Sequence, residues 1–233
     1  MGWLWLARAV VAVPSLLYAA VSDWRSRDID PRVWIAPIAA GVALDFLARW
    51  SPLDVASAVA SAVVAAMALG AAFTGLVGGA DALALTSIAA LFPSPATVPQ
   101  LLWPHRMPPI MFVLCFTGLC GLGVVASNVL HNARRAWVLD HVGALSRWER
   151  LFLMLATRLV TVDELERMRF WFPLYAPPFV KRLSFSIDEA DTWEYWVPYL
   201  RAAGVQYVAA GWGVPMVTFI CVGGILCALG LCP

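Results

Sequence analysis

Long apolar stretches constrain this chain more than any other feature of its sequence. Hydrophobic residues make up 61% of the chain and charged residues only 13%, a composition typical of proteins that lie in a lipid bilayer. A helix needs roughly 20 predominantly apolar residues to cross the hydrocarbon core. The sequence therefore predicts an all-α polytopic membrane protein with about six transmembrane helices. The stretches that meet or approach this length are residues 3–22, 33–49, 55–77, 81–92, 110–130 and 208–231.

The first apolar stretch also fits a cleavable signal peptide, because Ala19 and Ala20 resemble the small residues that precede a cleavage site. Two features favour a retained membrane helix instead. The apolar stretch is long, and Arg8 interrupts its beginning. We therefore count residues 3–22 among the membrane helices.

Charge and residue types argue against several classes of function. The net charge of +1, without a run of lysine and arginine, gives no reason to expect nucleic-acid binding. The histidines, His105, His131 and His141, are scattered, and the five cysteines lack the paired spacing of a zinc site. We therefore expect no metal and no other cofactor.

The composition changes abruptly after the fifth apolar stretch. Ten of the sixteen basic and nine of the fifteen acidic residues fall between residues 131 and 207. We therefore predict three parts. Residues 1–130 form a membrane domain with helices one to five, residues 131–207 form a cytoplasmic α(+β) insertion, and residues 208–233 contain the last transmembrane helix.

Two local patterns predict secondary structure inside the insertion. Thr161 and Glu164 have the spacing of a capping box, which predicts the start of a short helix. Residues 182–188 alternate in polarity, which predicts a short strand. Both elements would lie outside the membrane.

The placement of arginines predicts the orientation of the chain, because short cytoplasmic loops carry an excess of positive charge. The loop of residues 23–32 contains three arginines, and Arg134 and Arg135 directly follow the fifth stretch. Arg49 and Arg106 fall on the other face. We therefore expect the first loop in the cytoplasm and the amino terminus outside.

Asp23 and Asp81 are the acids most closely tied to the apolar stretches. Asp23 ends the first stretch, and Asp81 follows Gly78, Gly79 and Ala80 and begins the fourth. Because the second stretch leads out and the third leads back, both acids emerge on the same side. Ionisable groups at membrane helices are costly and therefore mark functional sites. A simpler alternative is that Asp81 only caps its helix.

The other acids near the membrane have simpler interpretations. Asp45 precedes Arg49 by four residues, which favours an ion pair on the helix surface. Asp54 is expected to cap the third helix. Both fall on the outer face. Asp28 and Asp30 share the inner loop with Asp23 but lie among arginines, and Asp30 is a plausible cap for the second helix.

Two carboxyl groups that share a site hold one proton between them and titrate as a unit. In aspartic proteases one carboxylate takes a proton from water while its protonated partner polarises the peptide carbonyl. No serine or cysteine nucleophile with a plausible base is present, and no G-x-S-x-G motif occurs. Asp23 and Asp81 are therefore a candidate pair for hydrolysis.

The sequence around both acids resembles a known family. Gly78-Gly79-Ala80-Asp81 resembles the GxGD-type motif of type IV prepilin peptidases, in the variant typical of archaeal preflagellin and prepilin peptidases. Residues 21–29 resemble the family's first aspartate motif, in which a membrane helix ends in aspartate before basic residues. Residues 212–220 are similar to the proline-containing start of its last helix.

This resemblance implies a multi-pass aspartyl endopeptidase of the plasma membrane. Such an enzyme removes short basic leader peptides from type IV pilin-like or archaellin precursors at the cytoplasmic face. The catalytic positions would be Asp23 and Asp81, and the motif loop would be Gly78, Gly79 and Ala80. The lack of the cysteine-rich amino-terminal segment of bifunctional bacterial enzymes implies cleavage without N-methylation.

The chain departs from the family pattern at two positions. Leu83 stands where many members have lysine, and Ala80 replaces the second motif glycine, a change that archaeal members tolerate.

A basic leader would meet acids at the inner face. The candidates for this contact are Asp28, Asp30, Glu164 and Glu166.

Two other functions stay open at this point. A presenilin-like protease that cuts within a membrane helix would hold both acids deeper in the bilayer. A small transporter or assembly protein would use them as a proton relay or to pair with a partner helix. Shortening of a pilin-type precursor by the purified protein distinguishes the peptidase from the transporter.

Overall fold

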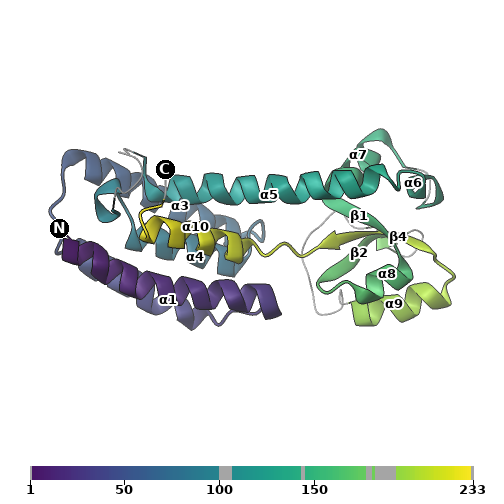
Figure 1. Ribbon diagram of the computed structural model, residues 1–233, viewed down its shortest axis with the longest axis horizontal. Helices are drawn as coiled ribbons and strands as arrows, with labels where there is room; N and C mark the ends of the chain where they lie inside the picture. The colour runs from purple at the N-terminus through teal and green to yellow at the C-terminus, as the bar shows by residue number, and fades with distance from the viewer. Residues whose placement is uncertain (1, 100–106, 143–144, 177–179, 182–192, 232–233) are drawn as a thin grey trace. The chain divides into compact units, whose positions relative to one another are not determined.

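The computed structural model describes residues 2–99, 107–142, 145–176, 180–181 and 193–231 (Figure 1). The chain divides into two compact units. The first consists of Met1–Cys120 and Pro215–Pro233, and the second of Gly121–Val214. Each unit has its own hydrophobic core.

Six helices occupy the apolar stretches that the sequence predicts to cross the membrane. Their bounds are α1 Gly2–Ser26, α2 Ile35–Asp45, α3 Pro52–Phe73, α4 Gly79–Leu91, α5 Pro109–Ala133 and α10 Met216–Ala228. Among the described residues, α1, α3 and α5 are long and apolar enough to cross a membrane. Helices α4 and α10 have 13 residues each, about 20 Å of helix, against roughly 30 Å of hydrocarbon core. The total of six spans therefore stays a prediction.

In the first unit, α4 contacts α1, α2, α3 and α10, and α1 lies along α10 (Figure 1). Glycines allow two of these helix pairs to approach closely. A Cβ atom at Gly41 would lie 2.6 Å from the backbone of Ala90, and one at Gly224 would lie 2.8 Å from Ile88 Cδ1. Small residues at such contacts are typical of helices that pack within a membrane.

Arg8 joins three helix ends at one end of this unit. It is 1% exposed, and its guanidinium donates to the carbonyl oxygen of Leu91 at 2.7 Å and to Asp45 Oδ1 at 2.7 Å. The expected pairing of Asp45 with Arg49 is therefore wrong. A fully buried guanidinium needs a counter-charge and hydrogen-bond acceptors, and Asp45 and the end of α4 supply them.

Three of the predicted helix starts can be compared with the structure. Asp30 caps the short 3-10 helix η1 (Pro31–Trp34) that precedes α2, as predicted. The cap of α3 is Ser51 rather than Asp54, and Asp54 completes the capping box from the third helical position. The predicted capping box of Thr161 and Glu164 is confirmed.

The second unit is built on a four-stranded antiparallel sheet with the strand order β1-β4-β2-β3. The strands are β1 Thr157–Thr161, β2 Trp171–Ala176, β3 Val180–Lys181 and β4 Tyr207–Trp212. The helices are α6 Val138–Val142, α7 Arg147–Ala156, α8 Val162–Arg167 and α9 Trp193–Ala202. Alternate strand residues face opposite sides. Val208 and Ala210 pack in a core with α8 and α9, and Ala209 packs in a core with α6 and α7.

The prediction of a membrane helix that begins at residue 208 is wrong for residues 208–212. These residues belong to β4, which lies between β1 and β2 and is buried over its four central residues. A strand covered on both faces has a continuous apolar sequence, which periodicity alone cannot distinguish from a buried helix. The last helix begins only at Met216, after Pro215. The strand predicted for residues 182–188 lies outside the described residues.

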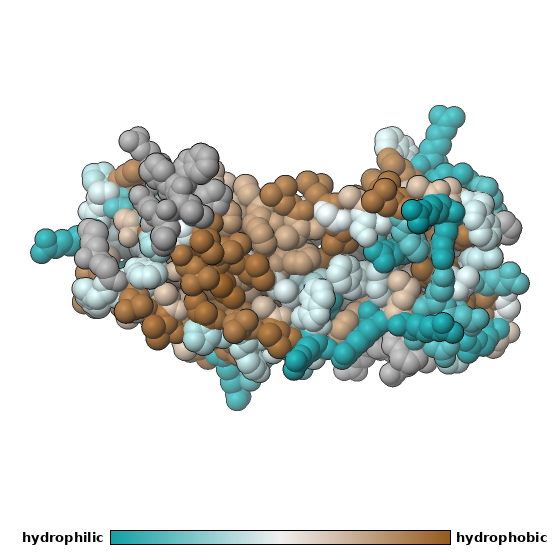
Figure 2. Space-filling view, in the orientation of Figure 1, coloured by the Kyte–Doolittle hydropathy of each residue, from teal (hydrophilic) through white to brown (hydrophobic). Residues whose placement is uncertain are grey.

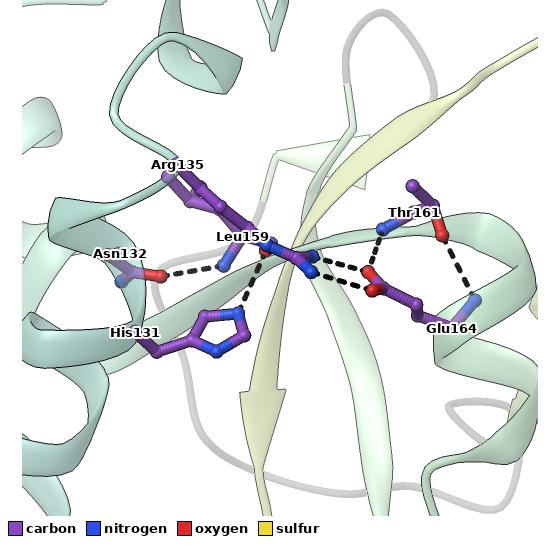
Figure 3. A network of polar contacts seen from close by, with 6 residues as sticks. All are labelled: His131, Asn132, Arg135, Leu159, Thr161 and Glu164. Atoms are coloured by element: carbon purple, nitrogen blue, oxygen red, sulfur yellow. Dashed lines mark hydrogen bonds and ion pairs between the residues drawn. The ribbon is translucent and has the colours of Figure 1, made fainter.

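Polar side chains at the end of α5 hold β1 and α8 in place (Figure 3). Asn132 is fully buried, and its Oδ1 accepts the backbone N–H of Leu159 at 2.9 Å. The guanidinium of Arg135 binds both carboxylate oxygens of Glu164, with 2.7 Å between Nη2 and Oε1. Hydrogen bonds from Arg135 lower the pKa of Glu164 to about 2. Glu164 therefore stays ionised at neutral pH and already has a basic partner.

Candidate active site

Asp23 lies in the last turn of α1 and is almost fully buried, with 7% of its surface exposed. Its Oδ2 accepts the backbone N–H of Thr218 at 2.8 Å and lies 2.9 Å from the hydroxyl oxygen of Thr218. Arg27, one turn further along the chain, places Nη1 3.6 Å from Asp23 Oδ1. These contacts hold the carboxylate at one fixed place between α1 and α10.

The beginning of α10 explains why Thr218 binds Asp23. The first N–H groups of a helix have no acceptor within the helix. Pro215 occupies the N-cap position of α10 and its side chain makes no capping hydrogen bond. The Asp23 carboxylate accepts the free N–H of the third helical residue, Thr218, and thus caps α10 from another helix. The positive end of the helix dipole favours a carboxylate at this position.

Asp81 is the third residue of α4. The N-cap position belongs to Gly78, so the interpretation of Asp81 as the N-cap is wrong. Its carboxylate accepts a hydrogen bond from the backbone N–H of Gly78. This bond gives the N–H of the N-cap residue an acceptor. Asp81 is only partly buried, in contrast to Asp23.

The two acids lie close enough to interact electrostatically. The charge of Asp23 acts on the Asp81 carboxyl, and both charges act on the buried thiol of Cys221 in α10. Helices α1, α4 and α10, which carry these side chains, pack together (Figure 1). The end of α1 and the starts of α4 and α10 therefore form one site, at the end of the first unit opposite to Arg8.

Gly78 has a specific steric reason to be glycine. A Cβ atom at this position would lie 2.8 Å from Asp81 Oδ2, whereas a Cβ atom at Gly79 would meet nothing within 4 Å. Gly78 has an ordinary extended backbone, with φ −63° and ψ 141°, so its conformation does not require glycine. The requirement comes from the close approach of the Asp81 carboxylate.

This difference predicts unequal effects of two adjacent substitutions. If the two acids are the expected pair for hydrolysis, Gly78→Ala displaces the Asp81 carboxylate and slows precursor cleavage up to about a hundredfold, the loss for a misplacement of about 1 Å. Gly79→Ala adds a methyl group in open space at a helical position, where alanine is favourable, and is the matched control. Cleavage rates of the two purified variants test this prediction. Equal activity of both variants would contradict the steric argument.

Four further acids were predicted to meet a basic leader. Asp28 and Asp30 are exposed in the loop after α1, and Asp30 is used as a helix cap. Glu164 and Glu166 belong to the second unit, where Arg135 binds Glu164 and Arg201 lies 3.0 Å from Glu166 Oε2. Asp23, Asp81 and Gly78 are therefore the predicted residues that the structure brings together.

Sequence reasoning missed Thr218. Its contact with Asp23 spans 195 positions in the sequence, so no local pattern connects the two residues. One signal was available, since Thr218 is the third residue after Pro215, where a helix start leaves N–H groups without acceptors. The identity of the acceptor became visible only in the folded chain.

Comparison with known proteins identifies the family of the chain. The model of the type IV leader peptidase family matches residues 10–126. This segment contains Asp23, Gly78 and Asp81, and it spans slightly more than half of the 233 residues. No curated protein matches the chain. With both acids inside the matched segment, the chain belongs to the type IV leader peptidase family.

Proposed function

We propose that the chain is a membrane aspartyl endopeptidase with Asp23 and Asp81 as its catalytic pair. Its substrates are type IV pilin-like or archaellin precursors, from which it removes a short basic leader at the cytoplasmic face of the plasma membrane. The family makes the chain a leader peptidase, and the long apolar helices make it a membrane protein. The observation that supports the aspartyl mechanism is that two carboxyl groups from separate, packed helices lie close enough to interact electrostatically at one end of the bundle.

The surroundings of the two acids differ, and this difference assigns their roles. Asp23 receives the N–H and hydroxyl of Thr218 and lies beside Arg27. Donors and positive charge stabilise the ionised form of a carboxyl group. Asp81 has the negative charge of Asp23 nearby, which favours its protonated form. The proton that the pair shares therefore resides on Asp81, and Asp23 is the base.

Hydrolysis then proceeds with Asp23 as general base and Asp81 as general acid. Asp23 takes a proton from a water molecule as the water oxygen attacks the carbonyl carbon of the scissile peptide. Asp81 gives its proton to the carbonyl oxygen and so neutralises the charge that develops there. When the C–N bond breaks, Asp23 passes its proton to the leaving amine and Asp81 regains one from the hydroxyl of the new carboxyl group.

The depth of the acids supports cleavage at the membrane border over cleavage within a membrane helix. Asp23 lies in the last turn of α1 and Asp81 in the first turn of α4. A leader peptide ends just before the hydrophobic helix of its precursor, so its scissile bond reaches the border of the bilayer. Helix ends are therefore the favourable place for the catalytic pair.

The direct test combines the purified full-length protein with a pilin-type precursor in the same lipid vesicles. We expect the precursor to lose its basic leader, and mass spectrometry of the product to show one new amino terminus directly before the hydrophobic helix. No metal is added, and a chelator is expected to leave the rate unchanged. A precursor that stays intact, or one that is cut inside its hydrophobic helix, would contradict the proposal.

A further inference from the structure

Helix α7 buries one face in the second unit and exposes a second apolar face. Leu153 is fully buried in the core shared with α6 and the sheet. Trp148, Leu151 and Leu155 are 79%, 48% and 37% exposed. Their spacing of three and four residues places them on one side of the helix. Figure 2 shows hydrophobic surface over α7. We name these three side chains the α7 stripe.

The carboxyl end of α7 is fixed to the last turns of α5. Asn128 Nδ2 donates to the carbonyl oxygen of Leu155 at 3.2 Å, and Asn132 Nδ2 donates to that of Met154 at 3.0 Å. Both asparagines are buried, with 3% and 0% of their surfaces exposed. Because buried amides bind firmly to acceptors that would otherwise lack a partner, the position of α7 relative to the end of α5 is well defined.

The end of α5 marks the border of the membrane. This helix has 25 residues, about 37 Å, and is apolar enough to cross a bilayer with a hydrocarbon core of roughly 30 Å. Leu122 and Leu130 are 65% and 71% exposed, as expected for side chains that face lipid. Asn128 and Asn132 therefore lie where α5 leaves the hydrocarbon core. The carboxyl end of α7, which they bind, therefore lies at the same depth.

The charges beside the α7 stripe fit lipid headgroups. Arg147 and Arg150 are exposed on the same helix, and Arg150 pairs with Asp140, which is itself exposed. Tryptophan prefers the boundary between lipid and water. Helices with arginine beside a stripe of tryptophan and leucine lie flat in that boundary, and anionic lipids attract their positive charge.

We propose that α7 lies in the headgroup layer of the membrane, with Trp148, Leu151 and Leu155 inserted among the lipids and Arg147 at the anionic headgroups. The occupant of the α7 stripe is thus the bilayer surface itself. This inference depends on α5 crossing the membrane and not on the peptidase mechanism. It gives the second unit a contact with the membrane in addition to the connections of its chain.

Photo-crosslinking in the full-length protein tests this inference. The photoreactive residue p-benzoylphenylalanine replaces Trp148 or Leu151, and the protein is reconstituted in nanodiscs of phosphatidylcholine and phosphatidylglycerol. The matched control carries the same residue at Glu166, which is exposed in α8. The five residues of β1, about 17 Å of strand, separate the end of α7 from the start of α8. Mass spectrometry then identifies lipid adducts on each peptide.

We expect lipid adducts at positions 148 and 151 and none at 166. The yield at 148 should fall several-fold in nanodiscs without phosphatidylglycerol, because Arg147 then loses its anionic partners. Failure of both stripe positions to capture lipid, or capture of a second copy of the chain instead, would overturn the inference. Equal yields in both lipid mixtures would overturn the preference for anionic headgroups. None of these readouts uses cleavage, so they stand apart from the test of the proposed function.

Discussion

Replacing either Asp23 or Asp81 by asparagine is expected to slow leader cleavage on the order of a thousandfold or more. Asparagine has nearly the same size as aspartate, but it neither takes a proton from water nor gives one up as an acid. In the proposed mechanism Asp23 takes the proton from water, and Asp81 gives its proton to the carbonyl oxygen. Because the two groups act as a unit, the double variant should lose little more activity than either single variant.

The rate at which the new amino terminus appears, measured in the same vesicles for each variant, checks this prediction. Asp163→Asn is the control, because Asp163 is 77% exposed in the second unit and pairs with the exposed Arg201. Asp23 also caps α10, so the thermal stability of Asp23→Asn has to be recorded. Asp81 also accepts a backbone hydrogen bond at the start of α4, so the thermal stability of Asp81→Asn is recorded as well. Unchanged cleavage by a folded Asp81→Asn variant would by itself rule out the acid pair.

The sequence allowed the two acids to be selected because local rules apply to them. Asp23 ends an apolar stretch and Asp81 begins another, and an ionised side chain at such a place is costly unless it has a role. The count of apolar stretches then placed both at the same end, where the structure also has them. Apolar character and length were enough, since each of the intervening helices forms near its predicted place.

Other parts of the fold depend on partners far away in the sequence. The spacing of Asp45 and Arg49 satisfies a general helix rule, yet the partner of Asp45 is Arg8, 37 positions away. An intrahelical pair at a helix surface contributes little, whereas the buried Arg8 requires a counter-charge. The residues of β4 look like a helix for a related reason, because their apolar character reflects burial between two layers that only the folded unit contains.

The contact between Thr218 and Asp23 has the strongest functional consequence among these long-range features. Thr218 touches no reacting atom in the proposed mechanism and acts through Asp23, so it is a positioning residue. Its hydroxyl oxygen lies 2.9 Å from Asp23 Oδ2 and 3.0 Å from the carbonyl oxygen of Ala20. The single hydroxyl proton goes to the carboxylate, because an ionised acceptor binds more strongly than a neutral one.

Thr218→Val is therefore expected to lower kcat roughly tenfold to a hundredfold, the range for losing one hydrogen bond to a charged group, with little change in KM. Valine keeps the shape of threonine and the backbone N–H but lacks the hydroxyl donor. With one donor fewer, the Asp23 carboxylate is held less firmly at the position from which it takes the proton of water. Thr218→Ser keeps the donor and should restore kcat.

The pair of variants distinguishes this role from a merely structural one. If the methyl group of Thr218 only packed the start of α10, Thr218→Ser would be impaired and Thr218→Val, which keeps a methyl group, would not. A lower kcat in Thr218→Val, with KM unchanged and with full activity in Thr218→Ser, assigns the effect to the hydroxyl hydrogen bond with Asp23. If both variants cleave as fast as the unaltered protein, the hydroxyl has no part in holding Asp23, and the carboxylate is held by the backbone N–H of Thr218 and by Arg27.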